Sequence, residues 1–176
     1  MQEPDPVDIR AAMAGDTAAF ERLVRAYQLP VWRFLSHQLG DRGLAEDVAQ
    51  DAFVNLYRRL GTFDFRAKFS TWVFQVARNA GIDAMRRRAR QDRVARAVHR
   101  PLAAAGPEGG FELSAALADL PPALREALLA VEVLGLPYAD AASVLSVPAG
   151  TVKSRVFRAR RLLSEWMAAG EAADEL

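Results

Sequence analysis

The segment GTVKSRVFRARRLL, residues 150–163, combines five cationic side chains with regularly spaced apolar ones. On a helix, at about 100° per residue, the apolar positions form one stripe, made of Val152, Val156, Ala159 and Leu163. Opposite that stripe lie Ser154, Arg158 and Arg161, flanked by Thr151, Arg155 and Phe157. Arginine binds phosphates and guanine edges, and serine or threonine binds either. This helix therefore has the chemistry of a polyanion-binding surface, and a solvated helix face is the alternative.

A second, apolar helix is predicted directly before this segment, over residues 138–145, from the sequence YADAASVL. Only the short turn SVPAG separates the two helices. Two helices joined by a tight turn, the second with a cationic outer face, are typical of a helix-turn-helix. In that motif the N-terminal part of the second helix enters the major groove of DNA. On the pattern alone, an ordinary helical hairpin is the alternative.

Another candidate site lies on the long helix predicted from Thr71 to about Arg93. Valines and alanines line one face of this helix. The other face carries Trp72, Gln75, Asn79, Asp83 and Arg86, and Arg86 begins the basic cluster RRRAR. The preceding loop, TFDFRAKF, adds Phe63, Phe65 and Phe69 beside Arg66 and Lys68. Unpaired bases stack on aromatic rings at about 1–3 kcal/mol each, so this set is typical of a site for single-stranded bases. The alternative, that Trp72 and Phe69 are core residues, is the better supported by pattern alone. Both hold if Phe69 is buried while Trp72 makes the contact.

An acidic face marks the helix predicted over residues 44–60. Its apolar positions are Ala45, Val48, Ala49, Ala52, Phe53 and Leu56, and its outer face carries Glu46, Asp47, Gln50, Asp51 and Asn55. Carboxylates repel DNA, so this face is a solvated surface, a metal site or a protein interface. The chain has two histidines, His37 and His99, and neither stands at a ligand spacing. We therefore predict no metal site and no cofactor.

The fold that holds these segments is predicted to be all-α, with two small helical domains joined by a flexible linker. Apolar residues recur at intervals of three and four, and strand patterns are nearly absent. Residues 98–112, VHRPLAAAGPEGGFE, contain two prolines and three glycines and are the predicted linker. The domains are then residues 1–97 and residues 113–170, the second ending in the helix-turn-helix. Helices are expected over residues 7–14, 17–39, 44–60, 71–93, 113–118, 121–134, 138–145 and 148–167. We expect Pro30 to kink or split the second of these and Ser70 to cap the fourth.

Charge is distributed in blocks, although the net charge is only +1 at pH 7. Residues 61–100 hold 10 Lys and Arg against 3 Asp and Glu, and residues 148–167 hold 5 against 1. Acidic segments flank both blocks, which suggests two contacts with one polyanion. The chain has no cysteine, no apolar run of membrane-span length and no secretory signal, so we expect a cytoplasmic protein.

Three motifs resemble, in order and spacing, those of bacterial RNA polymerase sigma factors of the extracytoplasmic-function (ECF) group of the sigma-70 family. They are AEDVAQDAFVNLYRRL, FSTWVFQVARNAGIDAMRRR and, after the linker, LPPALREALLAVEVLGLPYADAASVLSVPAGTVKSRVFRARRLL. The resemblance implies a transcription initiation factor with sigma domain 2 in the first domain and sigma domain 4 in the second. The partners it implies are core RNA polymerase (the clamp coiled coil of the largest subunit, and the flap region), promoter DNA and an anti-sigma factor. No membrane insertion is expected.

The resemblance also implies roles for residues at matching motif positions. Contact with core polymerase is assigned to Asp47, Gln50, Asp51 and Asn55. Reading and opening the minus-ten element is assigned to Arg66, Lys68, Trp72, Gln75, Arg78, Asn79, Arg86 and Arg87. Reading the minus-thirty-five element is assigned to Thr151, Lys153, Ser154, Arg155, Phe157, Arg158 and Arg161, with Lys153 and Arg155 on phosphates.

The chain departs from the family pattern at a few positions. Asp51 stands where glutamate is usual. Gln75 and Val76 stand where housekeeping members carry paired tryptophans, which implies weaker strand melting. Two other function classes remain open: an autonomous helix-turn-helix regulator, and an enzyme that uses Glu46, Asp47 and Asp51. The enzyme hypothesis lacks a nucleophile–base pair, a phosphate-binding glycine loop and a metal-ligand set.

Overall fold

The computed structural model describes residues 3–96 and 111–174, and every regular element within them is a helix. The chain divides between α4 and α5 into two compact units, which confirms the predicted all-α, two-domain architecture. The predicted linker, residues 98–112, lies outside the described residues except for its last two positions, which begin α5. Among the described residues, no helix is both long and apolar enough to cross a membrane.

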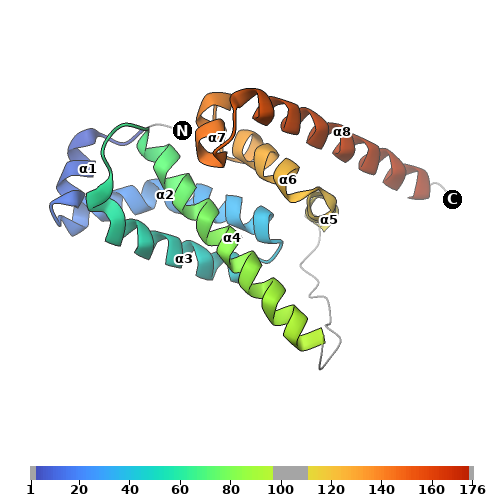
Figure 1. Cartoon of the computed structure of the whole chain (residues 1–176), viewed down its shortest axis with the longest axis horizontal. Helices are drawn as coiled ribbons and strands as arrows, with labels where there is room; N and C mark the ends of the chain where they lie inside the picture. The colour runs from blue at the N-terminus through green and yellow to red at the C-terminus, as the bar shows by residue number, and fades with distance from the viewer. Residues whose placement is uncertain (1–2, 97–110, 175–176) are drawn as a thin grey trace. The chain divides into compact units, whose positions relative to one another are not determined.

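The N-terminal unit contains four α-helices (Figure 1). They are α1 (Pro6–Met13), α2 (Thr17–Leu39), α3 (Arg42–Arg59) and α4 (Phe69–Arg96), with a short 3-10 helix, η1 (Leu60–Thr62), after α3. The helices α2, α3 and α4 all pack against one another, and α1 packs on α2. This arrangement leaves one side of α3 and one side of α4 free of helical neighbours in this unit.

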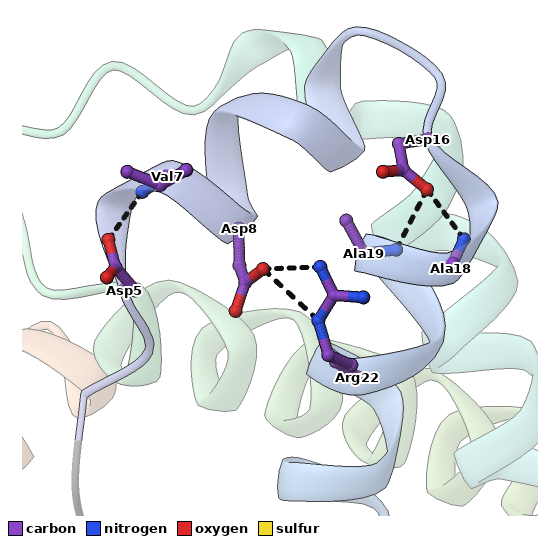
Figure 2. Close-up of polar contacts among 7 residues, drawn as sticks. All are labelled: Asp5, Val7, Asp8, Asp16, Ala18, Ala19 and Arg22. Carbon is purple, nitrogen blue, oxygen red and sulfur yellow. Dashed lines mark hydrogen bonds and ion pairs between the residues drawn. The ribbon is translucent and has the colours of Figure 1, made fainter.

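Aspartates begin the first three helices. Asp5 Oδ1 accepts a hydrogen bond from the Val7 N–H at 2.8 Å, and Asp16 Oδ1 accepts from Ala18 and Ala19, as Figure 2 shows. Asp41 Oδ1 accepts from the Leu44 N–H at 3.0 Å. Each carboxylate satisfies a backbone donor that has no partner within its own helix, which stabilises a helix by about 1 kcal/mol.

Large aromatic residues from α2 and α4 form the core of this unit. Tyr27 and Phe34 of α2 and Phe69 and Phe74 of α4 are each at most 2% exposed. The helix α2 continues through Pro30 without a split, which leaves a kink at Pro30 as the remaining prediction. One local prediction was wrong: the helix α4 begins at Phe69, so Ser70 lies inside the first turn and does not cap it. Ser70 is instead buried, because its side chain is used in a contact with the N-terminal segment that is described below.

The helices α2 and α4 approach closely at Gly81. A Cβ at this position would overlap the side-chain oxygen of Gln38 and lie 3.0 Å from Leu35 Cδ2. Gln38 and Leu35 are 2% and 0% exposed, so neither has free space to move into. The missing side chain of Gly81 is therefore a packing requirement of this helix pair.

We expect Gly81→Ala to lower the free energy of unfolding of this unit by about 1–2 kcal/mol. Overpacking a core costs about 1–3 kcal/mol, while replacing a helical glycine with alanine recovers at most about 1 kcal/mol. The matched control is Gly43→Ala in α3, where the nearest atom to a new Cβ is Asp41 Oδ1 at 3.7 Å. Urea denaturation should show a lower midpoint for the first variant and an equal or higher one for the second. Equal midpoints for the two variants would contradict the packing argument.

The C-terminal unit contains α5 (Phe111–Asp119), α6 (Pro122–Leu128), α7 (Tyr138–Leu145) and α8 (Ala149–Asp174). The predicted helix over residues 121–134 is helical in the structure, but its last part is the π-helical segment η2 (Leu129–Val133). There the Leu134 N–H donates to the Leu129 carbonyl oxygen at 3.1 Å. Gly135 follows with φ +63°, the left-handed conformation that glycine adopts without steric cost.

The turn between α7 and α8 is three residues long, Ser146 to Pro148, and α8 begins one residue later than predicted. Ser146 has φ +56°, and the next N–H, of Val147, donates to the Ala142 carbonyl at 3.1 Å. The Pro148 carbonyl accepts from Thr151 at 2.9 Å and so begins α8. Small buried residues allow the two helices to pack closely, including Ala141 and Val144 of α7. Two helices with this tight turn form the predicted helix-turn-helix.

Candidate nucleic-acid interface

The helix α8 has one buried and one exposed face, at the positions that its periodicity predicts. Val152, Val156 and Ala159 are at most 1% exposed, whereas Leu163 is half-buried. The predicted contact residues Lys153, Ser154, Phe157, Arg158 and Arg161 are exposed, and Thr151 and Arg155 are half-buried. Phe157 is 70% exposed, so its ring is available to a partner surface.

The cations of α8 differ in whether a carboxylate neutralises them. Arg160 forms an ion pair with Glu132 of η2, and this hydrogen bond raises the pKa of Arg160. Arg161 Nε lies 3.4 Å from Glu165 Oε1. Within residues 3–96 and 111–174, no carboxylate pairs with Lys153 or Arg158. These two cations are therefore available to an external anion. The single hydroxyl hydrogen of Ser154 is donated to the Thr151 carbonyl oxygen, at 2.9 Å between the two oxygens.

The predicted contact face of α4 changes from half-buried to exposed along the helix. Trp72, Gln75 and Arg78 are half-buried, and Asn79, Arg86 and Arg87 are exposed. The Trp72 ring lies 5.4 Å from the Phe63 ring and 5.8 Å from the Phe69 ring, centroid to centroid. Trp72 thus rests on the core and still presents part of its ring to solvent. Further along, Arg86 Nη1 lies 3.6 Å from Asp83 Oδ1 in an exposed ion pair.

The loop before α4 presents fewer aromatic rings than predicted. Phe63 and Phe69 are 6% and 2% exposed and belong to the core, so only Phe65, at 40%, is available to a base. Phe65 has φ +59°. A bulky residue in the left-handed region costs roughly 1–3 kcal/mol and persists only where its surroundings hold it. The predicted cations Arg66 and Lys68 are both exposed, and Arg66 Nε lies 3.1 Å from Asp64 Oδ2.

One functional candidate, Arg10 of α1, was missed from the sequence. Its guanidinium carbon lies 5.1 Å from the centroid of the Phe65 ring, a cation–π geometry. No local pattern links the two residues, because they are far apart in the chain and belong to a helix and a loop.

The acidic face of α3 is exposed as predicted. All five of its predicted polar residues are exposed: Glu46, Asp47, Gln50, Asp51 and Asn55. The opposite side of α3 is buried as predicted, except that Phe53 is only half-buried. Two apolar residues of this surface, Val54 and Tyr57, are 48% and 47% exposed and were missed. Their spacing of four and seven residues from Gln50 was the signal that could have placed them there. An exposed surface that combines acids, amides and apolar side chains is typical of a protein interface.

The described residues contain no cluster of three or more His, Cys, Asp or Glu side chains that could hold a metal ion. Of the interpretations given for the carboxylates of the α3 face, a protein interface is the one that also accounts for the exposed apolar residues Val54 and Tyr57. A protein interface on the same unit as a candidate nucleic-acid surface is expected of a protein that carries another macromolecule to DNA.

Comparison with known proteins bears directly on these surfaces. Residues 23–91 match the family described as Sigma-70 region 2, and residues 110–163 match Sigma-70, region 4. The chain is 39% identical over 159 residues to the ECF RNA polymerase sigma factor SigC of Mycobacterium tuberculosis, covering 87% of this chain and 85% of that protein. It is 29% identical over 178 residues to SigW of Bacillus subtilis, covering 88% and 92%.

Two solved structures have the same fold. The sigma factor RpoE of Bartonella quintana, solved with the anti-sigma factor NepR, has a TM-score of 0.75 and 27% identity, and the match covers 85% of this chain and 96% of that one. CnrH, solved with the cytosolic domain of CnrY, also has a TM-score of 0.75, with 26% identity and coverage of 94% and 97%. The two matched regions include α3, α4 and α8, the helices that carry the three surfaces described above. The chain belongs to the ECF RNA polymerase sigma factors of the sigma-70 family.

Proposed function

We propose that this alternative sigma factor divides its work among three surfaces, each on a different helix. The acidic face of α3 binds core RNA polymerase, the face of α4 from Trp72 to Arg87 reads and opens the minus-ten element, and the exposed face of α8 reads the minus-thirty-five element. The observation that carries this proposal is the separation of charge within one unit. The acids of α3 are exposed, and so are Arg86 and Arg87 of α4, while Arg78 is half-buried. The two sets of charges lie on different helices, so one unit can bind a protein and DNA together.

The upstream contact is proposed for the first turns of α8. Lys153, Ser154, Phe157 and Arg158 project from the side opposite the buried stripe of Val152 and Val156. In a helix-turn-helix this part of the second helix enters the major groove. Arginine forms bidentate hydrogen bonds with guanine, whereas lysine acts on phosphate as a point charge. Arg158 is therefore the proposed base reader, and Lys153 and Arg155 are the proposed phosphate contacts. Thr151 and Arg161 complete the proposed set.

We expect Arg158→Ala and Lys153→Ala to weaken DNA binding in different ways. Loss of a bidentate base contact should cost about 1–3 kcal/mol and relax the preference at one base pair. Loss of a phosphate contact should weaken all sequences alike and reduce the salt dependence of binding by about one ion. Binding of the holoenzyme to a set of upstream-element variants at several salt concentrations separates the two. If both variants lose affinity evenly across sequences, Arg158 does not read a base.

The downstream contact is proposed for α4 and the loop before it. Asn79 offers an amide for base recognition, Trp72 offers part of a ring for stacking, and Arg86 and Arg87 offer guanidinium groups one to two turns further along the helix. Arg66 and Lys68 in the loop, with Gln75 and Arg78 on the helix, complete the proposed set. Single-stranded bases suit this face better than duplex DNA, because a ring can stack only on a base that has left the helix.

An autonomous helix-turn-helix regulator is the second candidate, since α7 and α8 alone account for duplex binding. The exposed acidic face of α3 favours the sigma factor, because a regulator that acts alone has no use for it. A gel shift with duplex promoter DNA, with and without core RNA polymerase, tests the choice. A sigma factor of this kind should bind tightly only as holoenzyme, and tight binding by the chain alone would support the regulator.

The partners follow from the same proposal. The clamp coiled coil of the largest polymerase subunit is the proposed partner of Asp47, Gln50, Asp51 and Asn55. The C-terminal unit is proposed to bind the flap region of the polymerase. RpoE was solved with the anti-sigma factor NepR, and CnrH with the cytosolic domain of CnrY. We propose that an anti-sigma factor likewise holds this chain until it is needed. The chain is proposed to act in the cytoplasm and to perform no chemistry itself, with catalysis left to the polymerase.

A further inference from the structure

The N-terminal helix α1 is anchored firmly on α2. Ile9 and Ala12 are each 3% exposed. Asp8 Oδ1 accepts two hydrogen bonds from Arg22, from Nη2 at 2.5 Å and from Nε at 3.1 Å, as Figure 2 shows. This charge-assisted contact and the two buried side chains together hold α1 against α2. Whatever α1 touches elsewhere is therefore held in a defined place relative to the core.

From this anchored position α1 reaches the loop between η1 and α4. Arg10 lies over the ring of Phe65, whose backbone has the left-handed φ of +59°. The Phe65 ring lies 4.9 Å from that of Phe63, and Phe63 lies 5.4 Å from Trp72, between ring centroids. A chain of contacts thus runs from Arg10 through two phenyl rings to the tryptophan of the proposed downstream site. The strained conformation of Phe65 needs a support, and the guanidinium of Arg10 over its ring supplies one.

The residues before α1 hold the other end of the same loop. The Glu3 carboxylate accepts hydrogen bonds from the Ser70 hydroxyl and from the Ser70 N–H, the latter at 3.3 Å. Ser70 is in the first turn of α4, where backbone N–H groups have no helical partner and a negative charge is favourable. Burial and, after it, the Glu3 carboxylate raise the pKa of the Tyr27 hydroxyl. Glu3 and Arg10 therefore brace the two sides of the segment from Phe63 to Ser70.

We propose that the segment from Glu3 to Arg10 is a positioning element for promoter opening: Arg10 holds Phe65, and Glu3 holds the start of α4, in the conformation that receives unpaired bases. This inference rests on the proposed function of α4 and adds residues that touch no DNA. Preorganising the loop removes the cost of ordering it at the moment when the strands separate. Losing the support should therefore slow opening and leave the upstream duplex contact unchanged.

The test uses the full chain with core RNA polymerase on a promoter selected from a random library by run-off transcription with the unaltered protein. Closed-complex binding and the rate of appearance of permanganate-reactive thymines are measured for Arg10→Ala, Arg10→Lys, Glu3→Gln and Phe65→Leu. The matched control is Arg25→Ala, because Arg25 is an exposed cation of α2 that pairs with Glu21 and not with the loop. It removes the same charge from the same unit.

We expect Arg10→Ala to slow opening about two- to fivefold, the factor that corresponds to an exposed cation–π contact. Arg10→Lys should recover most of the rate, Glu3→Gln should slow opening in the same sense, and Arg25→Ala should match the unaltered chain. The decisive measurement is the double variant: if Arg10 acts through Phe65, Arg10→Ala should have no further effect in the Phe65→Leu background.

Three results would overturn the inference: an unchanged opening rate for Arg10→Ala, an equal loss for Arg25→Ala, or additive losses in the double variant. A merely structural role of Arg10 would give additivity and would also weaken closed-complex binding. The control for the proposed function is the unaltered chain itself. If that chain opens no promoter with core polymerase, the proposed function fails; if it does and Arg10→Ala opens promoters equally fast, only the positioning role fails.

Discussion

The double variant Asp47→Arg with Gln50→Ala should abolish binding to core RNA polymerase and leave the fold intact. Both side chains are exposed on α3, so neither substitution creates a cavity or buries a charge. Charge reversal places a cation where the partner surface is proposed to meet an anion, and like charges across an interface cost several kcal/mol. We expect at least a hundredfold loss of affinity, which corresponds to about 3 kcal/mol. Co-purification with tagged core polymerase measures the effect.

A matched control tests whether the loss of polymerase binding is specific to the α3 face. Glu21→Arg with Gln28→Ala changes the net charge by the same amount at exposed positions of α2. Circular dichroism and the thermal midpoint should be close to those of the unaltered chain for both double variants. Undiminished co-purification of the α3 variant would contradict the assignment, and so would an equal loss for the α2 variant, since the effect would then be one of net charge alone.

Most of the helices were predictable because their signals are local. The aspartates at positions 5, 16 and 41 and the glycine at position 40 mark helix ends by side-chain or backbone chemistry that acts within a few residues. The faces of α3 and α8 were predictable because helical periodicity sorts apolar from polar positions, and most of the expected contact residues are exposed. Phe53 is half-buried because it lies at the edge of its apolar stripe. Leu163 lies within its stripe and is still half-buried, since its depth depends on how neighbouring helices pack and not on periodicity.

What the sequence did not reveal depends on contacts between distant residues. The loop of residues 62–69 has no period, so its three phenylalanines could not be sorted into core and surface. Burial of Phe63 and Phe69 follows from packing against α2 and α4, as in the 5.8 Å approach of the Tyr27 and Phe69 rings. The hydrogen bond from Ser70 to Glu3 spans 67 positions of the chain, which is why a residue that resembles a helix cap is not one.

Asn79→Ala and Trp72→Ala should leave the closed complex largely intact and impair strand opening. Closed-complex binding is proposed to depend on α8 and on the contacts of lysine and arginine side chains with DNA phosphates. Neither substitution changes these residues. Stacking on an aromatic ring is worth about 1–3 kcal/mol per base, so loss of Trp72 should reduce the open complex roughly five- to hundredfold. Permanganate reactivity of thymines in the minus-ten element reports the loss. Gln28→Ala, which removes an exposed amide from α2, is the control for Asn79→Ala and should have no effect.

A promoter with a pre-melted bubble distinguishes the two residues. If Trp72 serves to open the strands, the bubble should rescue Trp72→Ala, because the step it assists is already complete. If Asn79 recognises a base, the bubble should not rescue Asn79→Ala, because recognition is still required after melting. The contact of Trp72 with Phe63 and Phe69 predicts some loss of stability in Trp72→Ala, so its thermal midpoint is measured in parallel. A drop of several degrees with no rescue by the bubble would show that Trp72 acts as a core residue and that the stacking role belongs elsewhere on α4.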